Sequence, residues 1–182
     1  MLGFGYLEKV GKNFYSSYLV IDHNGDDLAN YRRMSAGWRM PSSEDKIYLE
    51  GIEFKPFKYL NKTFAVGLCG DFWKDDLVKK VSRDVDAILW PVFVCWTPKL
   101  WESQKFEAYV AQAKNLSETV FFVNSICKEE ISQAYGGAFS MISGLLYHSK
   151  QHAISLEMLW MLSILILMTV SLYFGRAFSS SA

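Results

Sequence analysis

The stretch FAVGLCGDFW, residues 64–73, places a cysteine, a glycine and an aspartate directly after an apolar run. A short continuous run of this kind is typical of a strand that is buried on both faces of a sheet. Because glycine lets the backbone turn sharply where such a strand stops, the thiol of Cys69 can face a cleft there. Taken alone, Cys69 is either a small apolar side chain of the core or a nucleophile at the edge of a sheet. Composition favours the core, since free cysteine is among the most buried residue types.

The pattern around this stretch alternates strands and helices. Upstream, residues 18–21 and 28–32 predict a hairpin that turns at Asn24-Gly25, and further strands are expected at 52–54 and 63–69. Downstream, stretches with helical periodicity alternate with short apolar runs, and these predict helices and strands respectively. The helices are expected at 74–87 and 98–118, and the strands at 87–94, at 119–127 and on both sides of Gly144. This order predicts an α/β fold with short connections.

Composition limits the class of protein and its partners. The 182 residues are enough for one domain with a sizeable core. The 19 basic residues balance the 19 acidic ones, so nucleic acid is not expected as a partner. The three cysteines, at 69, 95 and 127, have no metal-ligand spacing with the histidines and favour free thiols in a reducing compartment. We expect Cys95 and Cys127 to lie in the core.

The C-terminal part differs in kind, because residues 158–175 carry no charged side chain. A bilayer is spanned by roughly 17–25 apolar residues, and this run is apolar on every face. We therefore predict a membrane helix over 156–175 following a domain over 1–150, the alternative being a very apolar core helix. Lys150 and nearby histidines upstream of the run favour a cytoplasmic location for the preceding domain.

Several segments, taken in order, resemble the nitrilase (carbon–nitrogen hydrolase) superfamily. VGLCGDFW is similar to that family's nucleophile strand, in which a Cys-x-Asp segment follows an apolar run. YRR at 31–33 resembles its Tyr-Arg-Lys motif, and SEDKIYLEG at 43–51 its glutamate-containing stretch. DAILWPVFV, YVAQAKNLSETVFFVNSIC and YGGAFSMISGLL resemble its later elements, so the likeness covers residues 3–147. The resemblance implies an α-β-β-α four-layer sandwich, here incomplete.

The resemblance also implies a chemistry. The family uses a glutamate–lysine–cysteine triad to cleave an amide or a nitrile through a thioester, with no metal and no organic cofactor. On this alignment Cys69 is the nucleophile, and the N–H of Gly70 stabilises the tetrahedral oxyanion. Arg33 takes the lysine position, Glu44 matches an auxiliary glutamate, and Asp71 has a structural role.

Three departures from the family pattern bear on activity. Arginine at position 33 keeps the positive charge, but its planar head does not reproduce a lysine ammonium. The family's general-base glutamate lies upstream of every matched segment, and its C-terminal strand and tail are replaced by the apolar run. The resemblance thus implies a chain truncated at both ends, which forms a homo-oligomer where the family interface survives.

Two functions stay open on the sequence. One is a hydrolase that acts on a small-molecule amide or nitrile through Cys69. The other is a non-catalytic pseudoenzyme or scaffold subunit that the 156–175 helix anchors to a membrane. Trp90, Trp96 and Trp101 are expected to pack rather than to act, because large aromatic residues at that density usually form core.

Overall fold

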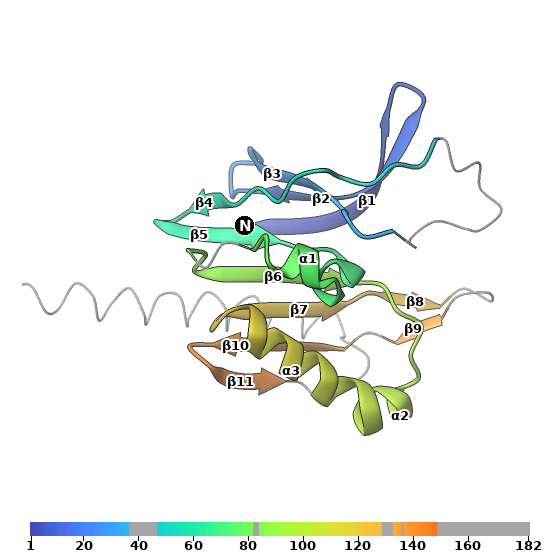
Figure 1. Cartoon of the computed structure of the whole chain (residues 1–182), viewed down its shortest axis with the longest axis vertical. Coiled ribbons are helices and arrows are strands. Elements are labelled where there is room, and N and C mark those ends of the chain that lie inside the picture. The colour runs from blue at the N-terminus through green and yellow to red at the C-terminus, as the bar shows by residue number, and fades with distance from the viewer. Residues whose placement is uncertain (37–46, 82–83, 129–132, 136, 149–182) are drawn as a thin grey trace, which may run out of the picture.

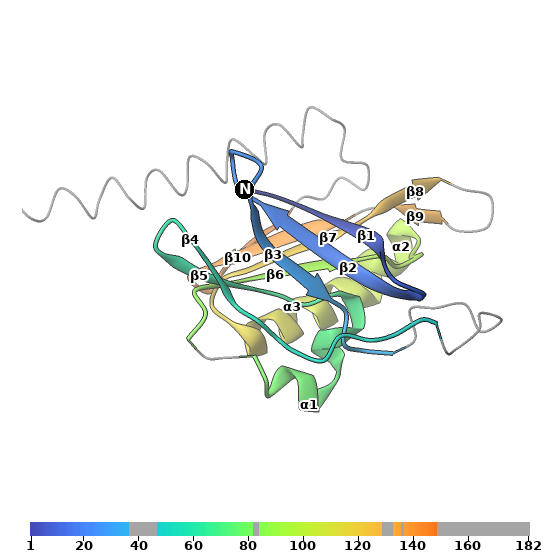
Figure 2. The same ribbon diagram turned by 90° about the horizontal axis from the view of Figure 1, so that it is seen from above.

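Two packed β-sheets, a separate pair of short strands and a layer of helices make up the described part of the chain (Figures 1 and 2). The computed structural model describes residues 1–36, 47–81, 84–128, 133–135 and 137–148. A three-stranded sheet lies against one face of a six-stranded sheet, and the helices pack against the opposite face of the six-stranded sheet. The described residues thus form three layers of the predicted four-layer sandwich.

The smaller sheet consists of two successive hairpins, β1 (Leu2–Val10), β2 (Asn13–Ile21) and β3 (Asp27–Arg32). Its second turn is stabilised by Asp22, whose carboxylate accepts hydrogen bonds from the backbone N–H groups of Asn24 and Asp26 at 2.7 and 3.0 Å. Gly25 adopts a φ of +92°, which glycine tolerates without strain. The hairpin predicted at Asn24-Gly25 is therefore confirmed, with strands longer than expected.

The larger sheet has a parallel centre and antiparallel edges. Strands β5, β6 and β7 run parallel, whereas β4 and the β10–β11 hairpin are antiparallel to their neighbours. The strand order is β11-β10-β7-β6-β5-β4. The bounds are β4 (Phe57–Tyr59), β5 (Lys62–Val66), β6 (Ala87–Val92), β7 (Val120–Asn124), β10 (Ala138–Ile142) and β11 (Leu145–His148), with a separate pair β8 (Ile126–Lys128) and β9 (Gln133–Tyr135).

The strand expected at 52–54 is absent, and this prediction was wrong. Ile52 is 92% exposed, and residues 51–56 form an extended segment outside both sheets. The close approach of Gly51 to β3 explains the difference. Its N–H donates to the carbonyl of Arg33 at 2.7 Å, and a β-carbon on Gly51 would collide with the backbone of Arg32. The segment follows the edge of β3 and first joins the larger sheet at β4.

The helical layer is η1 (Cys69–Trp73), α1 (Asp75–Val78), α2 (Pro98–Leu100), η2 (Trp101–Lys105) and α3 (Phe106–Leu116). The helix predicted over 98–118 is confirmed as the continuous run α2–η2–α3. The helix predicted over 74–87 was wrong in extent, because α1 has only four residues. Asp86 is held at the start of the larger sheet, where its carboxylate accepts from Lys62 and from the N–H of Thr63. The chain is thereby extended before β6 begins.

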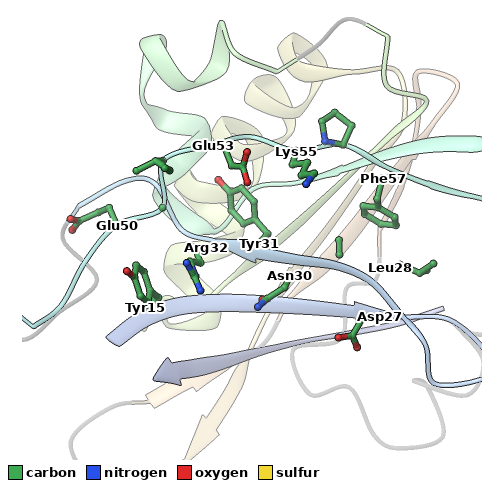
Figure 3. A pocket seen from close by; sticks show the side chains of 14 residues that line it. Tyr15, Asp27, Leu28, Asn30, Tyr31, Arg32, Glu50, Glu53, Lys55 and Phe57 are labelled. Atoms are coloured by element: carbon green, nitrogen blue, oxygen red, sulfur yellow. The ribbon is translucent and has the colours of Figure 1, made fainter. Parts of the chain in front are cut away.

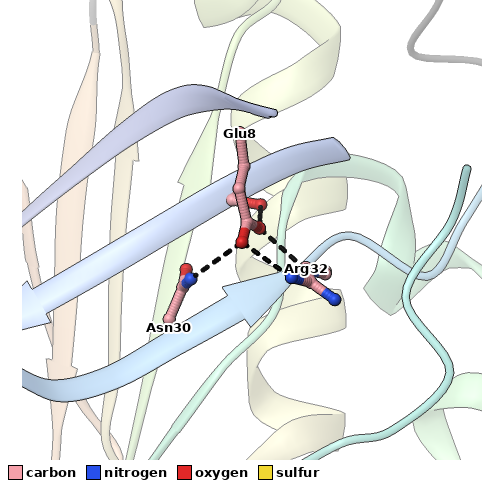
Figure 4. A network of polar contacts seen from close by, with 4 residues as sticks. Glu8, Asn30 and Arg32 are labelled. Carbon is pink, nitrogen blue, oxygen red and sulfur yellow. Dashed lines mark hydrogen bonds and ion pairs between the residues drawn. The ribbon is translucent and has the colours of Figure 1, made fainter. Parts of the chain in front are cut away.

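A polar network occupies the face of the smaller sheet that is opposite to Tyr31 (Figure 4). The carboxylate of Glu8 accepts two hydrogen bonds from the guanidinium of Arg32 at 2.7 Å each. It also accepts from Ser17 Oγ at 2.7 Å and from Asn30 Nδ2 at 3.4 Å. The bonds from Arg32 hold the pKa of the Glu8 carboxyl below its usual value. Glu8 therefore fastens the three strands to one another.

Three sequence predictions lie outside what the structure describes, namely the position of Glu44, the burial of the Cys127 side chain and the helix at 156–175. Within the ranges that the structure describes, no helix is long and apolar enough to cross a membrane.

Candidate functional site

Cys69 is the first residue of η1 and lies in the strained turn that follows β5. Its φ is +47°, a left-handed conformation that is rare for a residue with a β-carbon. Gly67, two residues earlier, allows the ring of Phe72 to fold back against the chain, because a β-carbon at that position would overlap the ring. The carbonyl of Cys69 accepts a hydrogen bond from Trp90 Nε1 at 3.0 Å. The side chain of Cys69 stays half-buried against the core.

Asp71 fastens this turn to the smaller sheet. Its side chain is buried, and each carboxylate oxygen accepts two hydrogen bonds. Oδ1 accepts from the N–H groups of Ser35 at 2.7 Å and Met34 at 3.2 Å. Oδ2 accepts from the N–H of Leu68 and from the hydroxyl of Tyr31, both at 2.8 Å. A charged acceptor with this many donors is a strong anchor, so Asp71 fixes the residues before Cys69 relative to the end of β3.

The Tyr31 hydroxyl is a permanent donor in this arrangement. Burial, followed by the nearby carboxylate of Asp71, raises its pKa well above the usual range for a phenol. The hydroxyl therefore stays protonated and continues to donate to Asp71.

Arg33 lies directly beside the turn at Cys69. A β-carbon built on Gly70 would stand 2.9 Å from Nη2 of Arg33 and 3.1 Å from Oγ of Ser35. The guanidinium is oriented by Ser35, whose Oγ accepts from Arg33 Nε at 2.9 Å. Gly70 is thus required for the close approach of the cation, and the arrangement brings a positive charge to the backbone that follows Cys69.

Aromatic residues form the wall on the other side of Cys69. The ring of Tyr109, on α3, contacts Trp73 at 4.8 Å and stacks on Trp90 at 5.0 Å between ring centroids. Burial raises the pKa of Tyr109 to about 12. Its hydroxyl is therefore neutral at physiological pH and is no proton acceptor for the thiol. Trp73 is 42% exposed and lies where η1 meets solvent.

The structure brings four of the five residues singled out in the sequence into one place, namely Cys69, Gly70, Asp71 and Arg33. Sequence reasoning missed two of their neighbours, Ser35 and Tyr31. Tyr31 lies near the end of β3, two residues before Arg33, and this alternate spacing was the available signal. No local pattern marks Ser35.

Two further expectations concern thiols and metals. Cys95 was expected in the core, but its side chain is exposed, so this prediction was wrong. It follows the end of β6, where the chain has left the sheet. Within the described ranges no three His, Cys, Asp or Glu side chains gather closely enough to hold a metal ion.

A separate groove of about 530 Å³ runs along the free edge of β3 (Figure 3). It is lined by residues 27–32 on one side and by residues of the 50–57 segment on the other. The guanidinium of Arg32 lies over the ring of Tyr15 at 4.2 Å from the centroid at this groove. Cys69 is not among the residues that line it.

Comparison with known proteins identifies the fold. No protein-family model and no curated protein matches the chain. Solved structures do match, among them a glutamine-dependent NAD+ synthetase from Acinetobacter baumannii at 21% identity and a TM-score of 0.67, covering 81% of this chain and 28% of that one. A carbon–nitrogen hydrolase from Helicobacter pylori G27 matches at 14% identity and a TM-score of 0.66, covering 82% of this chain and 57% of that one.

A nitrilase-superfamily amidase from Nesterenkonia sp. AN1 also matches, at 14% identity and a TM-score of 0.61, with 81% of this chain and 56% of that chain covered. The chain therefore spans between 28% and 57% of the length of these three proteins. The resemblance seen in the sequence is confirmed at the level of structure: over this part of its length, the chain has the fold of the nitrilase superfamily.

Proposed function

We propose that this chain carries the nucleophile of a carbon–nitrogen hydrolase that cleaves a small-molecule amide through a thioester on Cys69. The observation that carries the proposal is the contact between the Arg33 guanidinium and Gly70, directly after a cysteine held at a φ of +47°. This contact supports a site in which a nucleophile, a backbone donor and a cation face the same reacting carbonyl group.

The reaction has two halves. In the first, the Cys69 thiolate attacks the amide carbon, and the carbonyl oxygen becomes an oxyanion that the Gly70 N–H and the Arg33 cation stabilise. The C–N bond then breaks, and the nitrogen leaves as ammonia or an amine after taking up a proton. In the second half, water attacks the thioester, which releases a carboxylic acid and restores the thiol.

The acceptor of the thiol proton is neither of the two best-anchored carboxylates. Both oxygens of Asp71 are occupied by four hydrogen bonds. The carboxylate of Glu8 is committed to Arg32, Ser17 and Asn30 on the far face of the smaller sheet. The mechanism therefore needs a base other than Asp71 and Glu8, and the resemblance assigns that role to a glutamate upstream of the matched segments.

Two structures of the Nesterenkonia amidase suggest the first compounds to test. One holds butyramide, with a TM-score of 0.60, and another has acrylamide added at the active-site cysteine, with a TM-score of 0.59. For this chain we infer that short aliphatic amides are substrates and that acrylamide alkylates Cys69.

The test compares two thiols in one molecule. The protein is treated with acrylamide at pH 7, and modification of each cysteine is followed by peptide mass spectrometry. Cys95 is exposed and Cys69 is half-buried, so accessibility alone favours Cys95. An activated Cys69 is expected to react at least about tenfold faster, because a thiolate rather than a thiol is the nucleophile. Slower modification of Cys69 than of Cys95 would show that the thiol is not activated.

Hydrolysis is measured separately as ammonia released from butyramide. The wild-type chain is expected to release ammonia, and the Cys69→Ser variant is expected to release none above background. Cys95→Ser is the matched control and should hydrolyse at the wild-type rate, since Cys95 follows β6 outside the Cys69 turn.

The second candidate is a non-catalytic pseudoenzyme or scaffold subunit. Arg33 in the lysine position favours it, because a guanidinium does not reproduce the hydrogen-bond geometry of an ammonium. A wild-type chain that neither hydrolyses butyramide nor alkylates preferentially at Cys69 would establish this alternative over the hydrolase.

A further inference from the structure

Trp90, on β6, is the largest of the fully buried side chains among the described residues and has a relative exposure of 0%. Its one polar atom, Nε1, donates a hydrogen bond of 3.0 Å to the carbonyl oxygen of Cys69, 21 residues away in sequence. The indole therefore reaches from the core to the backbone of the nucleophile turn.

The ring has no freedom to rotate away from this bond. It meets the rings of Phe72 and Phe122 edge-on, with centroids 5.4 and 5.5 Å away, and it stacks on Tyr109 at 5.0 Å. Aromatic neighbours on several sides fix the plane of the indole and therefore the direction of its N–H.

The bonded carbonyl belongs to the same peptide group as the N–H of Gly70. A trans peptide is planar, so its C=O and N–H point in opposite directions. The first hydrogen bond of η1 runs from the Asp71 N–H to the carbonyl of Leu68 at 3.0 Å, and the N–H of Gly70 comes one residue earlier. Donors at that position in a helix have no partner within it, so the Gly70 N–H is available to a ligand.

We propose that Trp90 is a positioning residue for the oxyanion donor: by holding the Cys69 carbonyl, its indole aims the Gly70 N–H at the reacting oxygen. The inference rests on the proposed function, since it assigns a role within that same site. A hydrogen bond accepted by the carbonyl also polarises the peptide group, which strengthens the N–H as a donor.

A purely structural role makes a different prediction. A buried indole N–H usually finds some acceptor, and losing that bond would then lower stability without changing the chemistry. The variants Trp90→Phe and Trp101→Phe separate the two roles. Trp101 is also buried in the same aromatic cluster, where it stacks on Phe122 at 5.4 Å, and is the matched control. Both variants lose comparable packing, but only W90F loses the bond to Cys69.

Butyramide hydrolysis and thiol alkylation report on different parts of the site. Hydrolysis needs the oxyanion donor, whereas alkylation by iodoacetamide forms no oxyanion. W90F is expected to lower kcat about tenfold with KM within about twofold, because loss of an oxyanion donor acts on the transition state. Alkylation of Cys69 is expected to stay within about threefold of the wild-type rate. W101F should leave kcat unchanged, and an equal loss of kcat in both variants would overturn the proposal.

A measurement that does not depend on activity separates this inference from the proposed function. The amide resonance of Gly70 in a ¹⁵N-labelled chain is expected to move in W90F and to keep its wild-type position in W101F. An unmoved Gly70 resonance in W90F overturns the role of Trp90, whatever the activity. A wild-type chain without hydrolysis refutes the proposed function. The Gly70 resonance still decides whether Trp90 orients the N–H of Gly70.

A second variant covers loss of folding in W90F. Benzothienylalanine at position 90 keeps the ring shape and replaces the indole N–H by sulfur, so it removes the donor without leaving a cavity. The same shift of the Gly70 resonance is expected with it, and an unchanged resonance contradicts the proposal.

Discussion

The guanidinium of Arg33 lies so close to the α-carbon of Gly70 that a β-carbon there would stand 2.9 Å from Nη2. The two residues follow strands of different sheets, because Arg33 comes after β3 of the smaller sheet and Gly70 comes after β5 of the larger one. Asp71 makes the contact possible, because it binds the N–H groups of Met34 and Ser35 on one side and that of Leu68 on the other. The candidate site is therefore a product of the packing between sheets.

Gly70→Ala tests this contact. The added methyl group displaces the end of a flexible side chain, so the free energy of unfolding is expected to change by no more than about 1 kcal/mol. Butyramide hydrolysis is expected to fall at least about tenfold, since the cation leaves the oxyanion. Gly5→Ala is the control, because its β-carbon would meet no atom closer than 3.8 Å. Urea unfolding measures the stability of the variants, and ammonia release measures their hydrolysis. Unchanged hydrolysis in G70A would contradict the importance of the contact between Arg33 and Gly70.

Arg33 itself is tested by two substitutions. Arg33→Met removes the cation and is expected to lower kcat about a hundredfold, comparable to the loss of one oxyanion donor. Arg33→Lys keeps the charge but loses the Nε donor that bonds to Ser35, so about a tenfold loss is expected. Steady-state kinetics with butyramide distinguish them. Equal activity of both variants would show that the charge at position 33 does not act on the reaction.

Asp71→Asn tests the anchor between the sheets. An asparagine offers one acceptor oxygen, and its NH2 group would face two of the four donors that now bind the carboxylate. We expect the free energy of unfolding to fall by about 3 kcal/mol, the cost of leaving buried donors unpaired. Asp76→Asn, at an exposed position of α1, should change it by less than about 0.5 kcal/mol. Urea denaturation at pH 7 measures both, and similar values for the two variants would argue against the anchor.

Local patterns in the sequence predicted most of the sheet. The apolar runs of β5, β6 and β7 and the turns at Asn24-Gly25 and Gly144 depend on neighbouring residues, so their chemistry is readable from short stretches. Prediction of the site depended on the family resemblance, which indicated that Arg33 lies near Cys69 although 36 positions separate them in the sequence. The hydrogen bond from Trp90 to Cys69 and the role of Ser35 had no such signal, because they arise only when two sheets and a helix layer pack together.

The wrong predictions have physical causes of the same kind. Residues 74–87 have helical periodicity, but the carboxylate of Asp86 accepts hydrogen bonds from Lys62 and Thr63 at the start of β5. The chain is therefore not helical as it approaches β6. Cys95 was assigned to the core from its residue type alone, and it lies after the point where β6 leaves the sheet. In both cases the position of the residue in the folded chain outweighed the preference of the local sequence or of the residue type.

Glu8 gives the fold a dependence on pH. Its pKa is lower in the folded chain than the ordinary value of 4.5, because the bonds from Arg32 favour the charged form. The stability it contributes is therefore present above pH 4.5 and is lost as the pH falls through the folded-state value. Glu8→Gln is expected to lower the free energy of unfolding by about 1–2 kcal/mol at pH 7. In acid below the folded-state pKa, wild type and variant should converge.

Urea denaturation at a series of pH values checks this convergence. Glu107→Gln, on the exposed side of α3, is the control and should change stability by less than about 0.5 kcal/mol throughout. A constant difference between wild type and E8Q across the series would mean that the carboxylate charge of Glu8 does not hold the strands together.

The left-handed turn at Cys69 makes a prediction about stability that is independent of any activity. At a φ of +47° a β-carbon is strained, whereas glycine is not. Cys69→Gly is therefore expected to be more stable than Cys69→Ala by about 1 kcal/mol, although glycine is the more flexible residue when unfolded. At Cys95, which is exposed and has no positive φ, the order should reverse, with alanine more stable than glycine by roughly 0.5–1 kcal/mol. Urea denaturation of the four variants measures both differences. Alanine being more stable than glycine at both positions would show that the turn at Cys69 carries no backbone strain, and Cys69 would then be held by its hydrogen bonds alone.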